Sequence, residues 1–397
     1  MANLNNKIAL VIGASEESLY AINCAKDNGF EVVAFDGNKN AKGLGAADKS
    51  FVVDIKEPDK IINSLADLKP DVVLPVPIGF CLTTSGYIND YFKLKGVGEI
   101  ACKNCVDKFL FHQILSKYNL RNCDCYLINS ENYIQPERYP MILKPRFGSG
   151  SRMVVKLNNK NDFEENYKKI KNLNEDFICE TCVEGQEYGL DAAVINGEFN
   201  LVLLRKKEIT SPPYCQCLGY YSVVPENNKA LIDRIKVYMQ KLIEVLKIDN
   251  CLLHADIIDN GKESFIIELS PRPSGHNLHN NFTKIATNID MVKNYIDYAT
   301  KDNSDVNFIP KKVLPTLISY FNFENCIITK IPEISYLLSK YPLKKYVCNI
   351  KKGEICSKII DDSELMKRGY YILQGINEQD LKNLRDSLLK EFEVEYD

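Results

Sequence analysis

The chain has 397 residues, a hydrophobic content of 45%, a charged content of 26% and a formal net charge of −3 at pH 7. These values are typical of a globular protein with two or three domains, and the charge gives no reason to expect a nucleic-acid partner. The start of the chain does not resemble a signal peptide, and no apolar run approaches the ~20 residues that cross a membrane. We therefore expect a cytoplasmic protein that binds neither nucleic acid nor a membrane.

Fourteen cysteines are scattered along the chain, and two of their spacings are typical of zinc ligands. Cys102 and Cys105 form one CxxC pair, and Cys179 and Cys182 form another. Two such pairs could close a tetrahedral zinc site. Thiols normally stay free in a reducing cytosol, so we expect free thiols and keep the zinc site as the alternative.

Residues 7–100 alternate between strand-like and helix-like segments. Strands are expected at 7–13, 31–36, 50–54 and 71–75. A helix-like stretch that ends at Asn28-Gly29 follows the first strand, and another near 57–68 precedes the fourth. Strands that alternate with helices predict a doubly wound parallel sheet, which is an α/β architecture.

The first turn of this sheet, from Gly13 to Ser18, resembles a dinucleotide-binding loop only superficially. The GxGxxG fingerprint needs glycines where this chain has Ser15 and Ser18, because the backbone must approach a pyrophosphate closely. Two glutamates, Glu16 and Glu17, stand between these serines. The turn therefore argues against NAD and, less strongly, against a phosphorylated substrate at this position.

From Pro140 onward the pattern changes to short strands with turns, as expected of an α+β domain. A long amphipathic helix is predicted at 229–247. Its inner face is expected to consist of Ile232, Ile235, Met239, Leu242, Ile243 and Leu246. After Pro310 a smaller segment begins, with a strand at 314–321, a strand near 369–375 and a final helix at 377–392.

A strand that ends in a lysine leads into a loop of glycine and serine. The strand spans 141–145 and carries Lys144. The loop residues are Gly148, Ser149, Gly150 and Ser151. Glycines let backbone N–H groups approach phosphate oxygens, serines add donors, and the lysine supplies a positive charge. The pattern favours a phosphate-binding hairpin, and the alternative is an ordinary hairpin on the surface.

A second group of polar residues lies between Phe177 and Tyr188. A strand runs into a connection here, and Glu187 stands two residues after Gly185. Such a connection can offer backbone groups to an adenine ring, and the carboxylate could accept hydrogen bonds from both ribose hydroxyls. The alternative is a turn flanked by surface glutamates.

The third group follows the apolar strand that begins at Ile266. Side chains alternate along a strand, so Glu268 and Ser270 share one face. A carboxylate beside a second oxygen suits a hard cation such as Mg²⁺, and Arg272 suits a phosphate or carboxylate. This combination is typical of phosphoryl transfer, whereas the alternative is a buried strand that ends in a proline-rich turn.

The preceding strand supplies a second carboxylate, and an Asn-Gly pair between the strands predicts a hairpin. If Ile258 pairs with Ser264, then Asp256 faces Ile266 and Glu268 is its diagonal neighbour on the same face. Two carboxylates on one face repel each other unless a cation lies between them. The hairpin therefore predicts a site for Mg²⁺ ions that bridge nucleotide phosphates.

Taken in order, these motifs resemble the ATP-grasp superfamily of carboxylate ligases over about residues 7–300. Lys108, which opens a helix after Asp107, is similar to the first nucleotide-contacting lysine of that family. Residues 268–273 are most similar to the purine-biosynthesis members, and the last strand and helix are more similar to amino-acid and dipeptide ligases. The resemblance implies a preATP-grasp domain at 1–103, a two-lobed ATP-grasp domain at 104–310 with its lid lobe at about 140–205, and a small C-terminal domain at 311–397.

The resemblance also implies roles for individual residues. ATP phosphates would contact Lys108 and Lys144, the lid loop would be 148–151, and the transferred phosphoryl group would contact Arg272. The adenine and ribose would be bounded by Glu180, Val183 and Glu187, and two Mg²⁺ ions would bind Asp256, Glu268 and Ser270. Most members have asparagine where this chain has Ser270, so the metal role of this serine is an open alternative.

The function that this resemblance implies is ligation of two small molecules. A substrate carboxylate would be activated by ATP as an acyl phosphate, with release of ADP, and then joined to an amine. Purine-type chemistry on a ribonucleotide with bicarbonate or formate is the main alternative. A nucleotide-binding module without catalysis and an NAD-dependent oxidoreductase are weaker ones. Dimerisation is common in the family, so a homodimer is a further option.

Three more residues are candidates for substrate contact. His276 and His279 follow the metal-binding strand and could face the substrate or lie in a polar loop. Arg205 could bind a substrate carboxylate or face the solvent. No residue of the sequence identifies a base for the amine.

Overall fold

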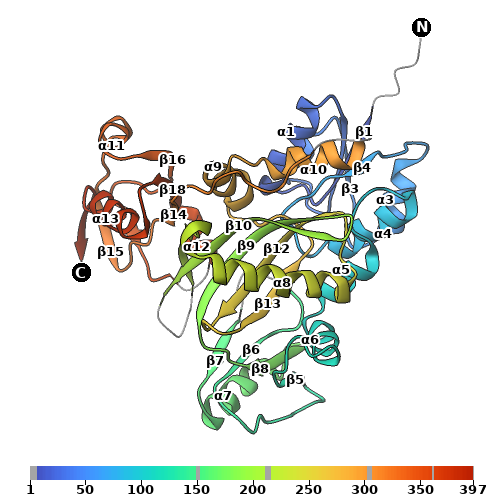
Figure 1. Cartoon of the computed structure of the whole chain (residues 1–397), viewed down its shortest axis with the longest axis horizontal. Helices are drawn as coiled ribbons and strands as arrows, with labels where there is room; N and C mark the ends of the chain where they lie inside the picture. Colours follow the sequence, from blue (N-terminus) through green and yellow to red (C-terminus); the bar gives the residue numbers. More distant parts are fainter. Residues whose placement is uncertain (1–6, 149–152, 211–215, 302–305, 360–361, 397) are drawn as a thin grey trace.

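The structure is a computed structural model, and it describes residues 7–148, 153–210, 216–301, 306–359 and 362–396. Four sheets organise these residues (Figure 1). A long central sheet occupies the middle, a parallel sheet forms the N-terminal part, and a small antiparallel sheet forms the lid lobe at the bottom of the view. A mixed α/β architecture of this kind confirms the predicted fold class.

The N-terminal sheet is parallel throughout, in the order β3-β2-β1-β4. Its strands are β1 (Ile8–Ile12), β2 (Glu31–Asp36), β3 (Lys49–Val52) and β4 (Val72–Val73). The surrounding helices are α1 (Leu19–Asp27), α2 (Lys42–Ala46), α3 (Pro58–Leu65), α4 (Leu82–Phe92) and α10 (Met291–Thr300). The order changes direction between β1 and β4, and ligands of open parallel sheets bind at such a switch point, beyond the carboxyl ends of the strands.

The central sheet has eight strands in the order β13-β12-β9-β10-β11-β14-β18-β16. The strands are β9 (Gln186–Ile195), β10 (Glu198–Ile209), β11 (Cys217–Ser222), β12 (Cys251–Asp259), β13 (Ser264–Ser270), β14 (Thr316–Tyr320), β16 (Leu343–Cys348) and β18 (Gly369–Gln374). Helix α8 (Lys229–Leu246) lies across the face of this sheet that is turned toward the viewer in Figure 1; we call it the back face, because the candidate site lies on the opposite face. The six residues predicted for the inner side of this helix are all buried, which confirms that prediction.

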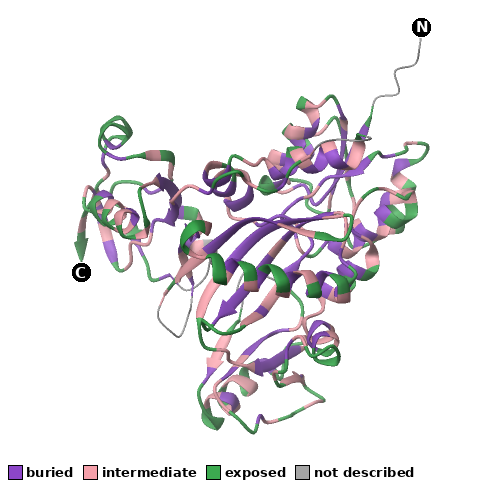
Figure 2. Cartoon of the chain, in the orientation of Figure 1, coloured by how far each residue is buried: buried purple, intermediate pink, exposed green. Residues whose placement is uncertain are grey.

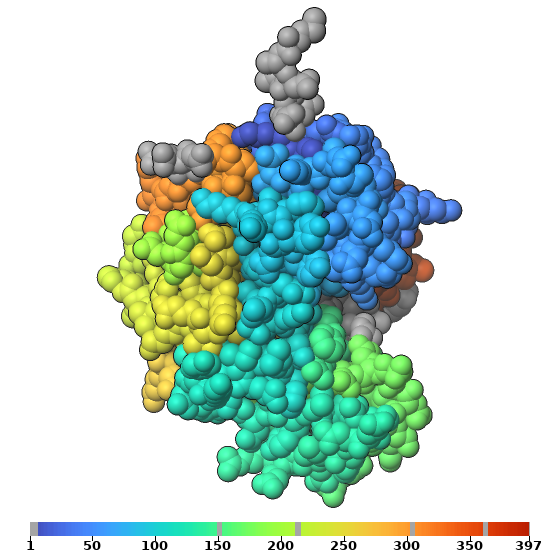
Figure 3. Space-filling view, turned by 90° about the vertical axis from the view of Figure 1, so that its right-hand side faces the viewer, coloured from blue at the N-terminus to red at the C-terminus, as the bar shows by residue number. Residues whose placement is uncertain are grey.

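The lid lobe is a four-stranded antiparallel sheet in the order β5-β8-β6-β7. Its elements are β5 (Cys125–Ile128), β6 (Met141–Pro145), β7 (Val155–Leu157), β8 (Phe177–Thr181) and α7 (Lys160–Ile170). Two helices, α5 (Glu99–Val106) and α6 (Lys108–Lys117), link it to the N-terminal part, which lies above it in Figure 3. The predicted lid range of about 140–205 differs from this lobe, because β5 joins the lid sheet whereas β9 and β10 join the central sheet.

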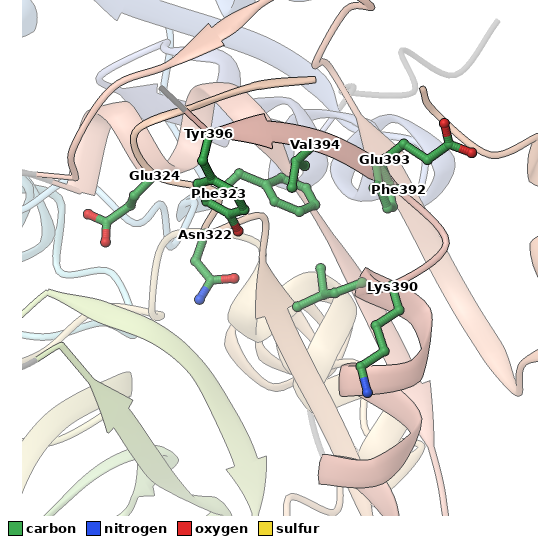
Figure 4. Close-up of a pocket in the computed structure, with 9 residues that line it drawn as sticks. Asn322, Phe323, Glu324, Lys390, Phe392, Glu393, Val394 and Tyr396 are labelled. Carbon is green, nitrogen blue, oxygen red and sulfur yellow. The ribbon is translucent and has the colours of Figure 1, made fainter. Parts of the chain in front are cut away.

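In the C-terminal segment β14, β18 and β16 extend the central sheet, whereas β17, β15 and β19 form a separate three-stranded antiparallel sheet in that order. The remaining elements are β15 (Cys326–Lys330), β17 (Ile355–Cys356), β19 (Glu393–Tyr396), α9 (Lys284–Thr287), α11 (Ile334–Lys340), α12 (Asp362–Arg368) and α13 (Glu378–Leu389). An open groove in this segment is lined by Asn322, Phe323, Glu324, Leu389, Lys390, Phe392, Glu393, Val394 and Tyr396 (Figure 4). It contains none of the residues predicted to bind nucleotide or metal.

Burial differs between the strands of the central sheet. Strands β9, β12, β14 and β18 are buried along most of their length, whereas the edge strand β16 and the outer side of α8 are partly or fully exposed (Figure 2). The thirteen cysteines within the described residues are all free thiols, and these residues contain no group of three His, Cys, Asp or Glu side chains placed to hold a metal ion by themselves. Among the described helices, none has the length and apolar character that crossing a membrane requires.

Candidate active site

Five of the predicted site residues lie on one face of the central sheet, which we call the front face. Strand pairing aligns Arg205 with Gly189, Gly189 with Asp256, and Asp256 with Glu268. Directly paired residues on neighbouring strands share a face, so this register forms one row across four strands. The same alternation places Glu187 on the front face two residues before Gly189, and Ser270 two residues after Glu268.

The register of the β12–β13 hairpin differs from the prediction. Asp259 pairs with Ser264, and an irregularity after Asp256 places this residue directly opposite Glu268. The expected partner, Ile266, instead pairs with Ile257 and is buried in the core beneath α8. The extra residue is therefore a β-bulge in β13, which re-aims the following side chain. The bulge brings the two carboxylates closer together than the diagonal arrangement predicted.

Lys207 is a front-face residue that the sequence reasoning missed. Its Nζ lies 2.7 Å from Asp256 Oδ2 and 3.6 Å from Glu187 Oε2. Burial alone would lower the pKa of Lys207, but the carboxylates of Asp256 and Glu187 outweigh it and raise that pKa. The same ion pair helps to hold the pKa of Asp256 below its usual range against the effect of burial. A sequence signal for Lys207 did exist, because this residue follows Arg205 and Lys206 at the polar end of a strand.

Arg205 is fully buried, which excludes the alternative that this arginine faces the solvent. Its Nη1 pairs with Asp191 Oδ2 and lies 3.3 Å from Ser274 Oγ, and its guanidinium lies 5.4 Å from the ring centre of Tyr220. Thr283 Oγ1 donates to the same Asp191 oxygen at 2.5 Å. Arg205 is thus anchored from several sides, and it lies in the front-face row beside Asp256.

Several buried polar atoms of this face have no hydrogen-bond partner among the described residues. They are Asp191 Oδ1, Arg205 Nε and Asp256 Oδ1. Buried polar atoms are almost always paired in folded proteins. Unpaired atoms of this kind are expected where a polar ligand supplies the missing partners.

The lid lobe contributes a buried cluster of charged residues around Glu180. Lys144 Nζ donates to Glu180 Oε1 at 2.7 Å, and His112 Nε2 contacts Glu180 Oε2. Arg121 Nη2 lies 3.5 Å from Glu180 Oε2. Burial opposes ionisation of Glu180, but Lys144 and Arg121 outweigh it and hold its pKa far below the usual range. The side chain of Glu180 therefore positions Lys144, and its backbone pairs with Cys125 and Ile142 in the lid sheet.

Arg121 also connects this cluster to β13, the strand that carries Glu268. Its Nη1 donates to the backbone carbonyl of Ile266 on β13. The Arg121 side chain is completely buried. The guanidinium of Arg121 therefore joins the lid-lobe cluster to β13 at Ile266, two residues before Glu268 of the front-face row.

Lys108 is placed by the cap of its helix. Asp107 is the N-cap of α6 and accepts hydrogen bonds from the backbone N–H groups of Phe109 and Leu110. Arg146, just beyond the strand of Lys144, binds both carboxylate oxygens of Asp107, at 2.8 and 2.6 Å. Lys108 Nζ donates to Gly148 O at 2.6 Å, so the two predicted phosphate-binding lysines and the start of the predicted loop meet here. Ser149, Gly150 and Ser151 lie outside the described residues.

Residues 182–185 connect the lid sheet to the central sheet, which is the position predicted for the adenine-binding connection. Val183 lies in this connection and is partly buried. Gly185 has φ +155°, and a Cβ at this position would meet Asp259 O at 2.6 Å. Only glycine fits this turn without a shift of the backbone.

The segment after the metal-binding strand joins three parts of the chain. The backbone N–H of His276 donates to Glu17 Oε1 at 2.7 Å, and its carbonyl accepts from Tyr320 Oη at 2.9 Å. Both His276 and Asn277 have left-handed backbone conformations, with φ of 57° and 62°, and such strain is common at functional sites. Glu17 therefore holds the backbone of His276 beside the first turn of the N-terminal sheet.

Arg272 and His279 occupy different environments in this segment. Arg272 lies against Gly79, whose Cβ position is 3.6 Å from Arg272 Nε, and its Nη1 donates to Pro273 O at 2.9 Å. His279 is buried, its Nδ1 contacts Ser274 O, and its ring lies edge-on to Tyr20 at 6.1 Å. Burial lowers the pKa of His279, so this residue packs within the segment, whereas Arg272 faces the N-terminal part.

The front-face residues fit magnesium by their chemistry. Asp256 and Glu268 are opposed carboxylates, Ser270 follows on the same face, and Asp256 Oδ1 lacks a partner. Mg²⁺ at nucleotide sites is commonly held by one or two protein carboxylates together with phosphate oxygens. A site of this type needs no third acidic or imidazole ligand from the protein.

Lys144, Asp256 and Glu268 lie within a segment that matches a known protein family. Residues 137–281 match the family described as ATP-grasp domain. A formate-dependent phosphoribosylglycinamide formyltransferase of Prochlorococcus marinus (strain MIT 9515) is 22% identical over 289 residues, which cover 67% of this chain and 70% of that protein. This chain is therefore similar to ATP-grasp proteins over residues 137–281.

Solved structures share the whole fold. The L-amino acid ligase from Bacillus licheniformis has a TM-score of 0.79 at 14% identity and covers 99% of both chains. Phosphoribosylglycinamide synthetase from Anaerococcus prevotii has a TM-score of 0.72 at 19% identity and covers 99% of this chain and 100% of that one. At such identities these likenesses show the fold alone.

Proposed function

We propose that the protein is an ATP- and Mg²⁺-dependent ligase that activates a small carboxylate as an acyl phosphate, releases ADP and transfers the acyl group to an amine. The observation that carries the proposal is the front-face row, in which Asp256 stands directly opposite Glu268 and Lys207 lies 2.7 Å from Asp256. Acidic ligands for a cation next to a buried lysine suit the transfer of a phosphoryl group.

The residues divide the work as follows. Lys144, held by Glu180, and Lys108 neutralise the phosphates, and the connection at 182–185 with Glu187 receives the adenosine. Asp256 and Glu268, with Ser270 beside them, would hold Mg²⁺, which offsets the negative charge of the reacting phosphates when it is bound. Arg272 would hold the transferred phosphoryl group or the acyl phosphate. Closure of the lid lobe excludes water from an acyl phosphate, which hydrolyses readily.

The purine-type alternative remains a second candidate because the formyltransferase of Prochlorococcus marinus matches over two thirds of the chain. An observation at the switch point disfavours a ribonucleotide phosphate there. Glu17 is exposed beside the first turn, and Glu16 pairs with Lys42 at 2.7 Å. Carboxylates repel a phosphate, so an uncharged or amine-bearing substrate fits this turn better.

Trapping with hydroxylamine tests the proposal. The protein is incubated with Mg·ATP, hydroxylamine and one candidate acid at a time, from a panel of amino acids, other small carboxylates and formate. We expect ADP and a hydroxamate from at least one acid. Formation of AMP and pyrophosphate would refute the acyl-phosphate route. ADP formation that requires both formate and a glycinamide ribonucleotide would favour the alternative.

A further inference from the structure

Strand β10 carries charged side chains on both faces at the end nearest the candidate site. Arg205 and Lys207 lie on the front face, and Lys206 and Glu208 alternate with them on the back face. The front-face pair contributes to the row of carboxylates described above. The back-face pair points away from that row, and the proposed reaction does not use it.

Helix α13 of the C-terminal segment binds these two back-face residues. Lys206 Nζ lies 2.8 Å from Glu378 Oε1, and Arg385 Nη1 pairs with Glu208 Oε2. Lys382 lies 2.8 Å from the same Glu378 oxygen. Because the three helix residues are spaced by four and three positions, they form a single face of α13. We call these contacts the α13 clamp.

Tyr221 completes the clamp from the neighbouring strand. It pairs with Lys206 across β10 and β11 and is buried. Its hydroxyl accepts from Arg385 Nη1 at 3.1 Å and donates to Glu208 Oε2 at 3.2 Å. Tyr221 and Leu381 belong to one apolar cluster. The ionic contacts therefore continue into a packed core, which restrains them more than isolated surface pairs.

The clamp acts where the strand is irregular. The pairing of β10 with β11 shifts between Glu208 and Ile209, and a bulge lets a strand rotate and re-aim its side chains. Lys207 stands between the two clamped residues, so any rotation of the strand would move its ammonium relative to Asp256. Functional groups need support that fixes them to about 0.5 Å, and the clamp supplies that support from behind.

We propose that α13 is a positioning element for the candidate active site, in which Glu378 and Arg385 fix the rotation of β10 and thereby hold Lys207 against Asp256. The C-terminal segment thus affects nucleotide binding, although it contains none of the residues that are proposed to contact nucleotide or metal. This inference rests on the proposed function only for its effect on nucleotide affinity, because the position of Lys207 is a property of the unliganded protein.

The test uses the full chain and two readouts. The variants are E378Q with R385Q, and the control is E391Q, since Glu391 also forms ion pairs in the C-terminal segment, with Lys340 at 2.6 Å, but does not touch β10. The first readout is the rate at which Lys207 is acylated by N-succinimidyl acetate, followed by peptide mass spectrometry. The second is the Kd of Mg·ADP, measured by calorimetry, with thermal unfolding recorded in parallel.

We expect the double variant to acylate Lys207 about fivefold faster and to bind Mg·ADP about fivefold more weakly, a change that corresponds to ~1 kcal/mol, while E391Q stays near the wild type in both. The charge-swapped variant E208R with R385E should restore both values, which a loss of general stability would not do. An acylation rate of Lys207 equal to that of the control overturns the proposal. If the wild type binds no Mg·ADP, the proposed function fails, and the acylation rates still decide whether the clamp positions Lys207.

Discussion

The ammonium of Lys207 lies 2.7 Å from the Asp256 carboxylate, at the place where the proposed reaction needs a metal ion. In the unliganded protein this lysine neutralises part of the charge that would attract Mg²⁺. Lys207 helps to hold the pKa of Asp256 below its usual range against the effect of burial, and we expect it to limit the binding of free metal until a nucleotide brings further negative charge.

Replacing Lys207 should change metal binding and nucleotide binding in opposite directions. In K207Q, Asp256 and Glu187 lose their shared cation, so the free protein should bind Mn²⁺, used as a probe for Mg²⁺, about tenfold more tightly. ADP should bind more weakly because a positive charge near the phosphates is lost. Titration by electron paramagnetic resonance and calorimetry measure the two affinities, and tighter binding of both ligands would contradict this role.

Glu268→Gln should reduce ADP formation by at least about 100-fold, because a neutral amide replaces a ligand of the cation that offsets the phosphoryl charge. The fold should persist, since Glu268 is partly exposed on the front face. Glu263→Gln is a matched control at the exposed tip of the same hairpin. A rate near that of the wild type at saturating Mg²⁺ would rule out the metal assignment.

Stability should fall as the pH decreases from about 6.5 to 4. Burial lowers the pKa of His254 to about 4, against the pull of Asp256, so the unfolded chain takes up a proton in this range while the folded chain does not. One such group contributes a slope of up to about 1.36 kcal/mol per pH unit. Chemical unfolding across this range should show the slope in the wild type.

The slope should become shallower in His254→Gln. His276→Gln serves as the control, because His276 is only partly buried in the loop after the metal-binding strand. If both variants keep the full slope, then other groups cause the acid sensitivity. Below about pH 4, loss of the ionised forms of Glu180 and Asp191, whose pKa values are lowered by their cationic partners despite burial, should destabilise every variant further.

Gly185→Ala should destabilise the protein by about 2 kcal/mol or more, because φ +155° and a 2.6 Å approach to Asp259 O leave no room for a methyl group. The connection between the two sheets would shift, so ADP affinity should decrease as well. Gly45→Ala, which meets no atom within 4 Å, is the control. Urea unfolding gives the first quantity, and unchanged stability would show that the connection tolerates the strain.

The sequence predicted the regular parts of the fold because local patterns determine them. The four N-terminal strands and the buried side of α8 follow from apolar runs and helical spacing, which depend on neighbours in the chain. The motif order around Lys144 and Glu268 indicated the ATP-grasp domain, whose family model matches residues 137–281. The metal and nucleotide roles of the individual residues stay predictions until a bound ligand or the assays above test them.

The remaining features depend on contacts distant in sequence. The bulge in β13 could not be predicted, since the strand reads equally well with strict alternation, and its cause lies in the packing of Ile266 under α8. Lys207 and Arg121 lacked a motif, because their importance arises from carboxylates 49 and 59 residues away in the chain. Arg205 can be buried because it pairs with Asp191 on the neighbouring strand β9. The sequence does not show which two side chains meet across these strands.

The continuity of the central sheet across β11 and β14 means that the final quarter of the chain is not a separable appendage. Gly219, Tyr220 and Tyr221 pair with β14, so a protein shortened at residue 310 would expose the bare edge of β11, the strand next to Lys207 on β10. An unprotected edge of this kind recruits strands from other molecules. A truncated protein of this type should aggregate, and its loss of activity would say nothing about a catalytic role for the missing part.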